Sequence, residues 1–326
     1  MAVTPLAITA GDPCGIGPEV ILKALGSARW RGPLLVIGHH AVFEQAARRL
    51  GSRLPWRSSR SITFLDCGHR REFAPGRSSA AAGRASLDYV DAALGLWRAG
   101  RVRAIVTGPV TKWAVNRSHP GFVGQTEYLA KALGVRDVVM FFVSDRLRIA
   151  LLTRHLPLGR VPSAMTRALL STSLRLTARS LTTQFGIPRP ALAVCGLNPH
   201  AGEGTPGSEE RRVIEPVLRA LRYSRIRCDG HFAADGFFAS ASLRRYDAVI
   251  CAYHDQGLIP FKLFARDRGC QMSVGLPLVR TSPDHGSALD IAGRGLANPG
   301  SMRYALRLAE RLAPPAGSGG VGPAGC

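Results

Sequence analysis

Three histidines each follow a strand-like run of residues, and together they could hold a metal ion. They are His155 in Thr153-Arg-His-Leu-Pro157, His200 in Asn198-Pro-His-Ala-Gly-Glu203 and His254 in Tyr253-His-Asp-Gln-Gly257. Imidazoles from three loops can bind one divalent ion and leave positions open for a substrate, as a Lewis-acid metal requires. Solvated loop histidines would give the same spacing, so the residues alone leave both interpretations open. We expect the other histidines, His39 and His40 among them, to be surface or loop residues.

Two glycine-rich turns also follow strand-like runs: Gly11-Asp-Pro-Cys-Gly-Ile-Gly-Pro-Glu19 and Thr107-Gly-Pro-Val-Thr-Lys112. Glycines allow a backbone to approach a ligand closely, and a helix that begins there offers unpaired N–H groups to an anion. The first turn has the spacing G-x-x-x-G-x-G, which is not the dinucleotide fingerprint G-x-G-x-x-G. Ligand contact and simple turn geometry both explain it.

A third glycine-rich string is longer and more specific: Asp284-His-Gly-Ser-Ala-Leu-Asp-Ile-Ala-Gly-Arg-Gly-Leu-Ala-Asn-Pro299. It resembles the loop with which isocitrate and isopropylmalate dehydrogenases bind the adenosine part of NAD. An irregular turn explains the glycines of this string but not the order of its polar residues.

These turns and loops require a scaffold of alternating strands and helices. Apolar runs typical of buried strands occur at 33–38, 104–107, 138–143, 147–152, 191–195 and 248–252, with a weaker one at 61–65. Amphipathic stretches at 19–25, 82–99, 163–185 and 209–223 lie between them. This alternation predicts an α/β fold with largely parallel sheets. The short connection Ser144-Asp-Arg predicts a hairpin, so one sheet is expected to be mixed.

Composition narrows the class of protein. A chain of 326 residues with 46% hydrophobic residues suggests two domains and excludes an intrinsically disordered protein. The formal net charge of +21 comes mainly from arginine, since only four of the 43 basic residues are lysine. The arginines are scattered, so compositional drift explains the charge better than nucleic-acid binding. Seven widely spaced cysteines and the absence of a signal peptide or spanning segment predict reduced thiols and a cytoplasmic protein.

The strings in combination resemble the 4-hydroxythreonine-4-phosphate dehydrogenase family of vitamin B6 synthesis. The resemblance runs in order from about residue 6 to residue 312. Besides the strings above, it is carried by Gly124-Gln-Thr-Glu127, His155-Leu-Pro-Leu158, Gly275-Leu-Pro277 and Arg280-Thr-Ser282.

The resemblance implies two α/β/α domains around a cleft, like those of isocitrate and isopropylmalate dehydrogenases, and a homodimer with a shared active site. We assign 1–120 plus 290–312 to the first domain, 121–289 to the second, with the metal site and dimer interface, and 313–326 to a disordered tail. The resemblance also implies oxidation of a secondary hydroxyl with NAD, or with NADP as the alternative, with the help of Zn, Co or Mg, after which the β-keto acid loses carbon dioxide.

The same resemblance assigns roles to individual residues. It implies metal ligands at His155, His200 and His254, and substrate contacts at Thr126, Lys262 and Arg280. Asp235 and Asp255 are candidates for proton transfer or for orienting ligands, and Lys262 is also a catalytic candidate. The implied cofactor-binding residues are His285, Gly286, Ser287, Ala288, Asp290 and Asn298.

Two residues depart from the family pattern at positions that face the substrate. Gln125 stands where the family typically has histidine, and Gln271 stands where it typically has asparagine. A glutamine keeps hydrogen-bonding capacity but cannot become a cation. The substrate is therefore either the B6 intermediate or a related acid, such as a phosphorylated threonate or erythronate or a terephthalate cis-dihydrodiol. Arg280-Thr-Ser282 argues against the dihydrodiol. An inactive paralogue and a nucleic-acid-binding protein are the alternatives of another class.

Overall fold

The computed structural model describes residues 3–68, 73–203, 209–222, 224 and 226–314. The chain forms two compact units. The first comprises Met1–Leu129, Asp267–Gln271 and Leu276–Cys326, and the second comprises Ala130–Arg266 and Met272–Gly275. This division differs from the expected domain boundaries, because residues 121–129 and most of 267–289 belong to the first unit. The expected disordered tail lies outside the described residues from 315 onward.

The first unit is built on a parallel sheet with the strand order β3-β2-β1-β4-β11. The strands are β1 (Leu6–Thr9), β2 (Leu34–Gly38), β3 (Ile62–Asp66), β4 (Ala104–Thr107) and β11 (Val279–Ser282). β1, β4 and β11 are buried along their whole length, as expected for parallel strands covered on both faces.

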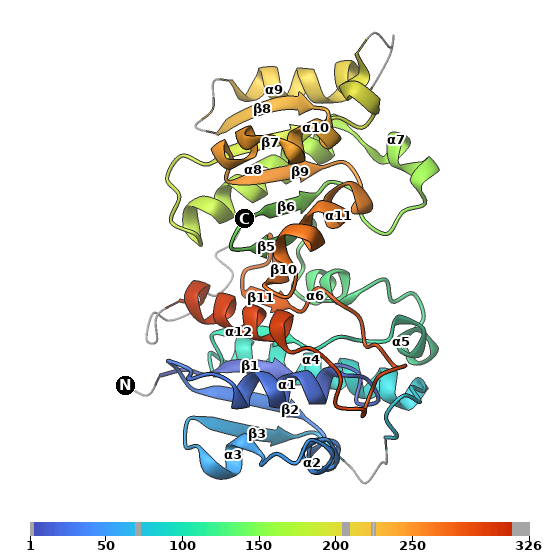
Figure 1. The fold of residues 1–326 in the computed structure, drawn as a ribbon, viewed down its shortest axis with the longest axis vertical. Helices are drawn as coiled ribbons and strands as arrows, with labels where there is room; N and C mark the ends of the chain where they lie inside the picture. Colours follow the sequence, from blue (N-terminus) through green and yellow to red (C-terminus); the bar gives the residue numbers. More distant parts are fainter. Residues whose placement is uncertain (1–2, 69–72, 204–208, 223, 225, 315–326) are drawn as a thin grey trace. The chain divides into compact units, whose positions relative to one another are not determined.

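Helices connect these strands and cover the sheet (Figure 1). They are α1 (Gly17–Gly26), α2 (His40–Arg49), α3 (Pro55–Ser58), α4 (Ala80–Arg98), α5 (Lys112–Ser118) and α12 (Gly300–Leu312), and α6 (Gln125–Ala132) begins in this unit. α12 packs against β11 and β4, and α4 packs against β1, β2 and β4. α4 begins where the Ser79 hydroxyl accepts a hydrogen bond from the Ala82 N–H at 3.2 Å, which satisfies one unpaired donor of the first turn.

The second unit contains the strand order β5-β6-β9-β7-β8. The strands are β5 (Val139–Ser144), β6 (Arg148–Leu151), β7 (Ala191–Cys195), β8 (Arg227–Phe232) and β9 (Ala248–Cys251). β5 and β6 form the expected antiparallel hairpin, and the other pairs are parallel, so the mixed sheet is confirmed. Strand β10 (Gly269–Val274) begins among residues of the first unit and ends among those of the second.

The helical segments of the second unit follow its strands. They are η1 (Leu158–Arg160), α7 (Val161–Ala164), α8 (Arg167–Thr183), η2 (Pro199–Gly202), η3 (Glu210–Ile214), α9 (Glu215–Leu221), α10 (Ala234–Ala239), η4 (Ala241–Arg245) and α11 (His254–Ala265). α11 packs against β5, β6 and β9. The apolar core beneath it includes Phe142, Ile149 and Phe261, and Phe261 makes an edge contact with Phe142.

One histidine of the first unit is buried within a loop. His39 lies between β2 and α2, as expected of a loop residue, and its Nδ1 shares a hydrogen bond with the hydroxyl of Tyr89 while its ring lies edge-on to Phe73. Burial raises the pKa of Tyr89 well above its ordinary value, so this hydroxyl stays protonated.

Two further observations concern the chain as a whole. In the described ranges, every cysteine is a free thiol, as expected. Within the same ranges, the helices are too short or too polar to cross a membrane.

Candidate active site

The three candidate metal ligands follow three neighbouring strands of the second unit. His155 follows β6, His254 follows β9 and His200 follows β7, and β9 pairs in parallel with both of the others. Parallel neighbours lie about 4.8 Å apart and end at the same edge of a sheet. The three loops therefore begin side by side, as loops that converge on one ligand must.

Hydrogen bonds join these loops at their bases. The Thr153 hydroxyl donates to the Ala252 carbonyl oxygen at 2.7 Å, which links the His155 loop to the end of β9. The Gln256 amide accepts from the Ala252 N–H at 2.6 Å and donates to the Gly196 carbonyl oxygen at 2.7 Å, which links the end of β9 to the His200 loop. Gln256 and Thr153 are positioning residues that sequence reasoning did not single out.

A buried carboxylate fixes the loop that carries His200. Glu210 Oε1 accepts from the backbone N–H groups of Leu197 and Asn198 at 2.7 and 2.8 Å, and Oε2 accepts from the Asn198 amide at 2.9 Å. Burial opposes the charge of Glu210, but the hydrogen bonds from Asn198 and Leu197 outweigh it, and the net effect is a lowered pKa. Sequence reasoning missed Glu210, because nothing in the helical pattern around it marks a carboxylate that turns inward.

The side chains in these loops fit a metal ion chemically, although they are not gathered around one point. The rings of His155 and His254 have centroids 6.2 Å apart. The Nδ1 atom of His254 lies 2.7 Å from Asp255 Oδ1, a contact that fixes the ring and directs Nε2 away from the carboxylate. Over the described ranges, the side chains of His, Cys, Asp and Glu do not form a group of three or more arranged to hold an ion. The metal ligands therefore stay a prediction.

The backbone at these positions is strained. Five non-glycine residues of the described chain have left-handed backbone conformations, and three of them, His155, His200 and Ala201, lie in the candidate metal loops. A fourth, Ala288, lies in the candidate cofactor loop. Such conformations cost about 1–3 kcal/mol each and cluster at functional sites. Their positions support a function for both loops.

Of the other catalytic candidates of the second unit, Asp235 and Asp255 lie just after strands, whereas Lys262 lies toward the far end of α11. Asp235 is in the first turn of α10 and has an exposed side chain. This helix follows β8, which pairs with β7. Asp255 is in the first turn of α11, and Lys262 is exposed in the last turn of that helix. The roles of these three residues are not tested by their positions.

The candidate substrate residues of the first unit converge on Arg280. This side chain is 2% exposed, and its NH1 atom donates to Gln271 Oε1 at 2.6 Å and to Thr126 Oγ1 at 3.3 Å. Its Nε atom donates to Thr107 Oγ1 at 3.1 Å. Burial lowers the pKa of Arg280 to about 10, so the guanidinium remains charged at neutral pH. Thr107 was expected only as part of a turn, and the structure adds it to this cluster.

Gln125 lies beside this cluster with half of its amide unsatisfied. It is 8% exposed, and its Nε2 donates to the Gly108 carbonyl oxygen at 3.0 Å. This contact fixes which amide atom is nitrogen, because the oxygen would face the carbonyl if the group were flipped. The buried Oε1 atom has no hydrogen-bond partner. An unpaired buried acceptor is costly, and a donor on a ligand would satisfy it.

The candidate cofactor loop has features that suit a bound group. The His285 Nε2 atom is buried without a hydrogen-bond partner, and an added side chain at Gly286 would meet no atom within 4 Å. Ser287 is anchored on both sides, since its carbonyl accepts from the Ile16 N–H at 2.9 Å and its hydroxyl shares a 2.7 Å hydrogen bond with Thr111. Asp290 is exposed, and Asn298 accepts from the Gly300 N–H at the start of α12.

Close packing accounts for the glycines of the first turn. Gly11 has a φ of +72°, and a Cβ there would lie 2.3 Å from the Pro109 carbonyl oxygen. A Cβ at Gly15 would lie 2.9 Å from the Cβ of Ser287. The turn therefore packs backbone to backbone against the other two glycine-rich segments, and this geometry explains its glycines without a ligand.

Comparison with known proteins identifies the family. The family model described as "Pyridoxal phosphate biosynthetic protein PdxA" matches residues 30–309. A protein of Chromobacterium violaceum named 4-hydroxythreonine-4-phosphate dehydrogenase is 43% identical over 321 residues, which cover 96% of this chain and 98% of that protein.

Solved structures agree with this match. A putative 4-hydroxythreonine-4-phosphate dehydrogenase from Salmonella typhimurium is 34% identical with a TM-score of 0.82, and the match covers 95% of this chain and 100% of that one. A terephthalate 1,2-cis-dihydrodiol dehydrogenase from Burkholderia xenovorans LB400 is 32% identical with a TM-score of 0.64, covering 94% and 98%. The α/β fold expected from the sequence is confirmed, and the chain belongs to the PdxA family of pyridoxal phosphate biosynthetic proteins.

Proposed function

We propose that this chain is an oxidoreductase that oxidises the secondary hydroxyl of 4-phosphohydroxy-L-threonine with NAD, in vitamin B6 synthesis. The oxidised β-keto acid then loses carbon dioxide and gives 3-amino-2-oxopropyl phosphate. The observation that carries the proposal is the buried, charged Arg280 among Thr126, Gln271 and Thr107, in a family whose members are named for this substrate. A guanidinium held in a fixed orientation by Thr107, Thr126 and Gln271 suits a phosphate or carboxylate. The Glu127 carboxylate also interacts favourably with the charge of this guanidinium.

Each residue of the candidate site has its own proposed role in the reaction. Arg280 and Thr126 bind the anionic end of the substrate, and Lys262 supplies a second positive charge. Asp255 holds the ring of His254 through Nδ1, so that Nε2 is the atom available to a ligand. Asp235 and Lys262 are the candidates for moving the hydroxyl proton.

A divalent metal and a dinucleotide complete the proposal. His155, His200 and His254 would hold Zn, Co or Mg, which supplies Lewis-acid polarisation of the substrate oxygen. The loop with His285, Gly286, Ser287, Ala288, Asp290 and Asn298 would hold NAD, with NADP as the alternative.

The proposal also includes a homodimer. α11 exposes the apolar side chains of Ile259 and Leu263, which are 62% and 74% exposed and lie one turn apart. An exposed apolar stripe of this kind supports an interface between subunits. The cytoplasmic location stays a prediction.

The deciding experiment is an absorbance assay at 340 nm with 4-phosphohydroxy-L-threonine and NAD. We expect NADH formation that a chelator abolishes and that added zinc, cobalt or magnesium restores, because the metal polarises the oxygen from which the proton leaves. Metal and NAD binding without turnover of any tested hydroxy acid would indicate the inactive paralogue. Tight, salt-sensitive retention of duplex DNA without an effect of NAD on Tm would indicate nucleic-acid binding instead.

The departure at Gln125, whose Oε1 atom is unsatisfied, supports a second candidate, a related acid, because a glutamine cannot become the cation that a histidine can offer to phosphate. Terephthalate-type dihydrodiols and phosphorylated threonate-type acids carry additional hydroxyls, and one of them could donate to this oxygen. A panel of these compounds assayed with NAD distinguishes the two candidates by their kcat/KM values.

Gln125→His tests whether this position selects the substrate. We expect the variant to raise kcat/KM for 4-phosphohydroxy-L-threonine by about tenfold, because a protonated imidazole can donate a charge-assisted hydrogen bond to phosphate. Thr182→His, on an exposed side chain near the end of α8, is the control that adds a histidine elsewhere. An unchanged ratio of kcat/KM between phosphorylated and unphosphorylated acids would remove Gln125 from substrate choice.

A further inference from the structure

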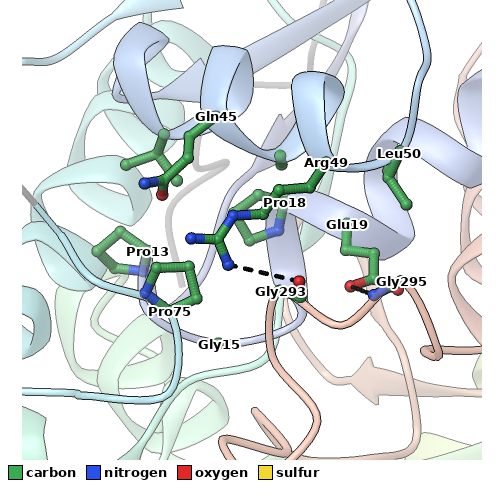
Figure 2. A pocket seen from close by; sticks show the side chains of 12 residues that line it. Pro13, Gly15, Pro18, Glu19, Gln45, Arg49, Leu50, Pro75, Gly293 and Gly295 are labelled. Atoms are coloured by element: carbon green, nitrogen blue, oxygen red, sulfur yellow. Dashed lines mark hydrogen bonds between the residues drawn. The ribbon is translucent and has the colours of Figure 1, made fainter.

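A partly buried ion pair on α1 joins that helix to the last part of the candidate cofactor loop. Glu19 is 4% exposed, and its Oε1 atom accepts from the Ala297 N–H at 2.9 Å. Its Oε2 atom accepts from the Gly295 N–H at 3.3 Å (Figure 2). A carboxylate in the first turn of a helix also interacts favourably with the helix dipole.

Lys23 completes the link one helical turn later. Its Nζ donates to Glu19 Oε1 at 2.8 Å, to the Gly295 carbonyl oxygen at 2.7 Å and to the Ala297 carbonyl oxygen at 2.8 Å. An ammonium group has three donors, and here all three have acceptors. The pair therefore binds both the N–H and the C=O of Gly295 and of Ala297, and it specifies the path of the backbone between them.

The segment held in this way would otherwise be free to adopt other conformations. Gly293 and Gly295 both have left-handed φ values, of 75° and 73°, and glycine populates several regions of backbone space at little cost. The segment borders a pocket that is also lined by residues of α1 and α2, by the turn before α1 and by Pro75 (Figure 2). Arg49 from α2 reaches into this pocket and donates weakly to the Gly293 carbonyl oxygen at 3.4 Å.

We propose that Glu19 and Lys23 are positioning residues for the dinucleotide. They fix residues 293–297, and through them the preceding residues 285–290, in the conformation that receives the adenosine end of the cofactor. This inference rests on the proposed function. Because the pair contacts only this loop and its own helix in the hydrogen bonds given above, it affects binding of the dinucleotide and not that of the hydroxy acid.

The test measures the binding of NAD and the binding of the hydroxy acid separately in the variant Lys23→Met. We expect the Kd and KM for NAD to rise about 10-fold to 100-fold, as for other losses of preorganisation, with the KM for the hydroxy acid within about twofold of wild type. Lys23→Arg keeps the charge, but its planar fork cannot direct three donors at these three acceptors, so we expect an intermediate effect. Lys131→Met, on an exposed side chain of α6, is the matched control.

The outcomes separate this inference from the proposed function. Calorimetry of the wild type with NAD comes first, and a wild type that does not bind NAD overturns the proposed function together with this inference. Wild-type binding with an unchanged Kd in Lys23→Met, or an equal rise in both KM values, overturns the inference alone. If Lys23→Met does not fold, Glu19→Gln provides the same comparison, because the amide oxygen can still accept from Ala297 while the charge is lost.

Discussion

His200→Ala is expected to lower kcat at least about 100-fold, a loss larger than that produced by removing a residue that only orients a metal ligand. His200 is exposed at the end of β7, and its side chain has few packing contacts to lose. Its loop is held by Glu210 and Gln256 through backbone atoms, which the substitution leaves in place. The variant should therefore fold normally and lose catalysis.

Three measurements check this result: kcat in the NADH assay, the bound zinc per subunit, and Tm by calorimetry. We expect kcat and metal content to fall together while Tm changes by no more than a few degrees in the metal-free proteins. His119→Ala removes another exposed histidine from the first unit and serves as the control. Turnover at the wild-type rate in His200→Ala would exclude His200 from the site.

Arg280→Lys is expected to lower kcat/KM for the phosphorylated substrate about 100-fold, mainly through KM, with the KM for NAD unchanged. The guanidinium donates to Thr107, Thr126 and Gln271 at once, and this fork fixes its orientation toward an anion. A lysine ammonium lacks the planar fork that directs these donors, so we expect it to lose some of these hydrogen bonds, at about 0.5–1.5 kcal/mol for each bond lost. Stability should fall as well as affinity.

The loss of affinity is distinguished from the loss of stability by measuring both. Kd for inorganic phosphate, as an anion probe, and Tm are compared between wild type, Arg280→Lys and the control Arg84→Lys, an exposed arginine of α4 that pairs with Asp88. Phosphate binding that weakens only in Arg280→Lys supports the anion site. Unchanged KM and phosphate affinity in a variant with lowered Tm would leave Arg280 with a purely structural role.

Much of the fold could be predicted from the sequence wherever apolar runs were continuous. The strands at 104–107 and 191–195 were predicted at the bounds of β4 and β7, because parallel strands buried on both faces read as unbroken hydrophobic runs. β11 was not predicted, since its Arg280-Thr-Ser sequence is polar although it is fully buried. α11 was not predicted either, because Pro260 interrupts a pattern that the packing against β6 nevertheless maintains.

Part of the candidate site could be predicted from the sequence. The loops that follow neighbouring parallel strands lie at one edge of a sheet, so residues in those loops are candidates for a shared site. The sequence indicated the residues that follow strands, and the adjacency of β6, β9 and β7 brings three of those loops together. The supporting residues were not predictable, because Glu210, Gln256 and Lys23 act through hydrogen bonds to backbone atoms of distant segments. The compact units differ from the expected domains for a similar reason: β11 pairs with β4, a contact that no local pattern reveals.

The left-handed backbone at His155, His200, Ala201 and Ala288 implies a conflict between robustness and activity. Each of these positions would be conformationally easier for a glycine, so a search for heat-resistant versions of this enzyme would tend to select replacements there. At His155 and His200, such replacements would remove the imidazoles that are proposed to bind the metal. Engineering for durability should therefore leave these four positions fixed and seek its gains elsewhere, for example in the exposed helices.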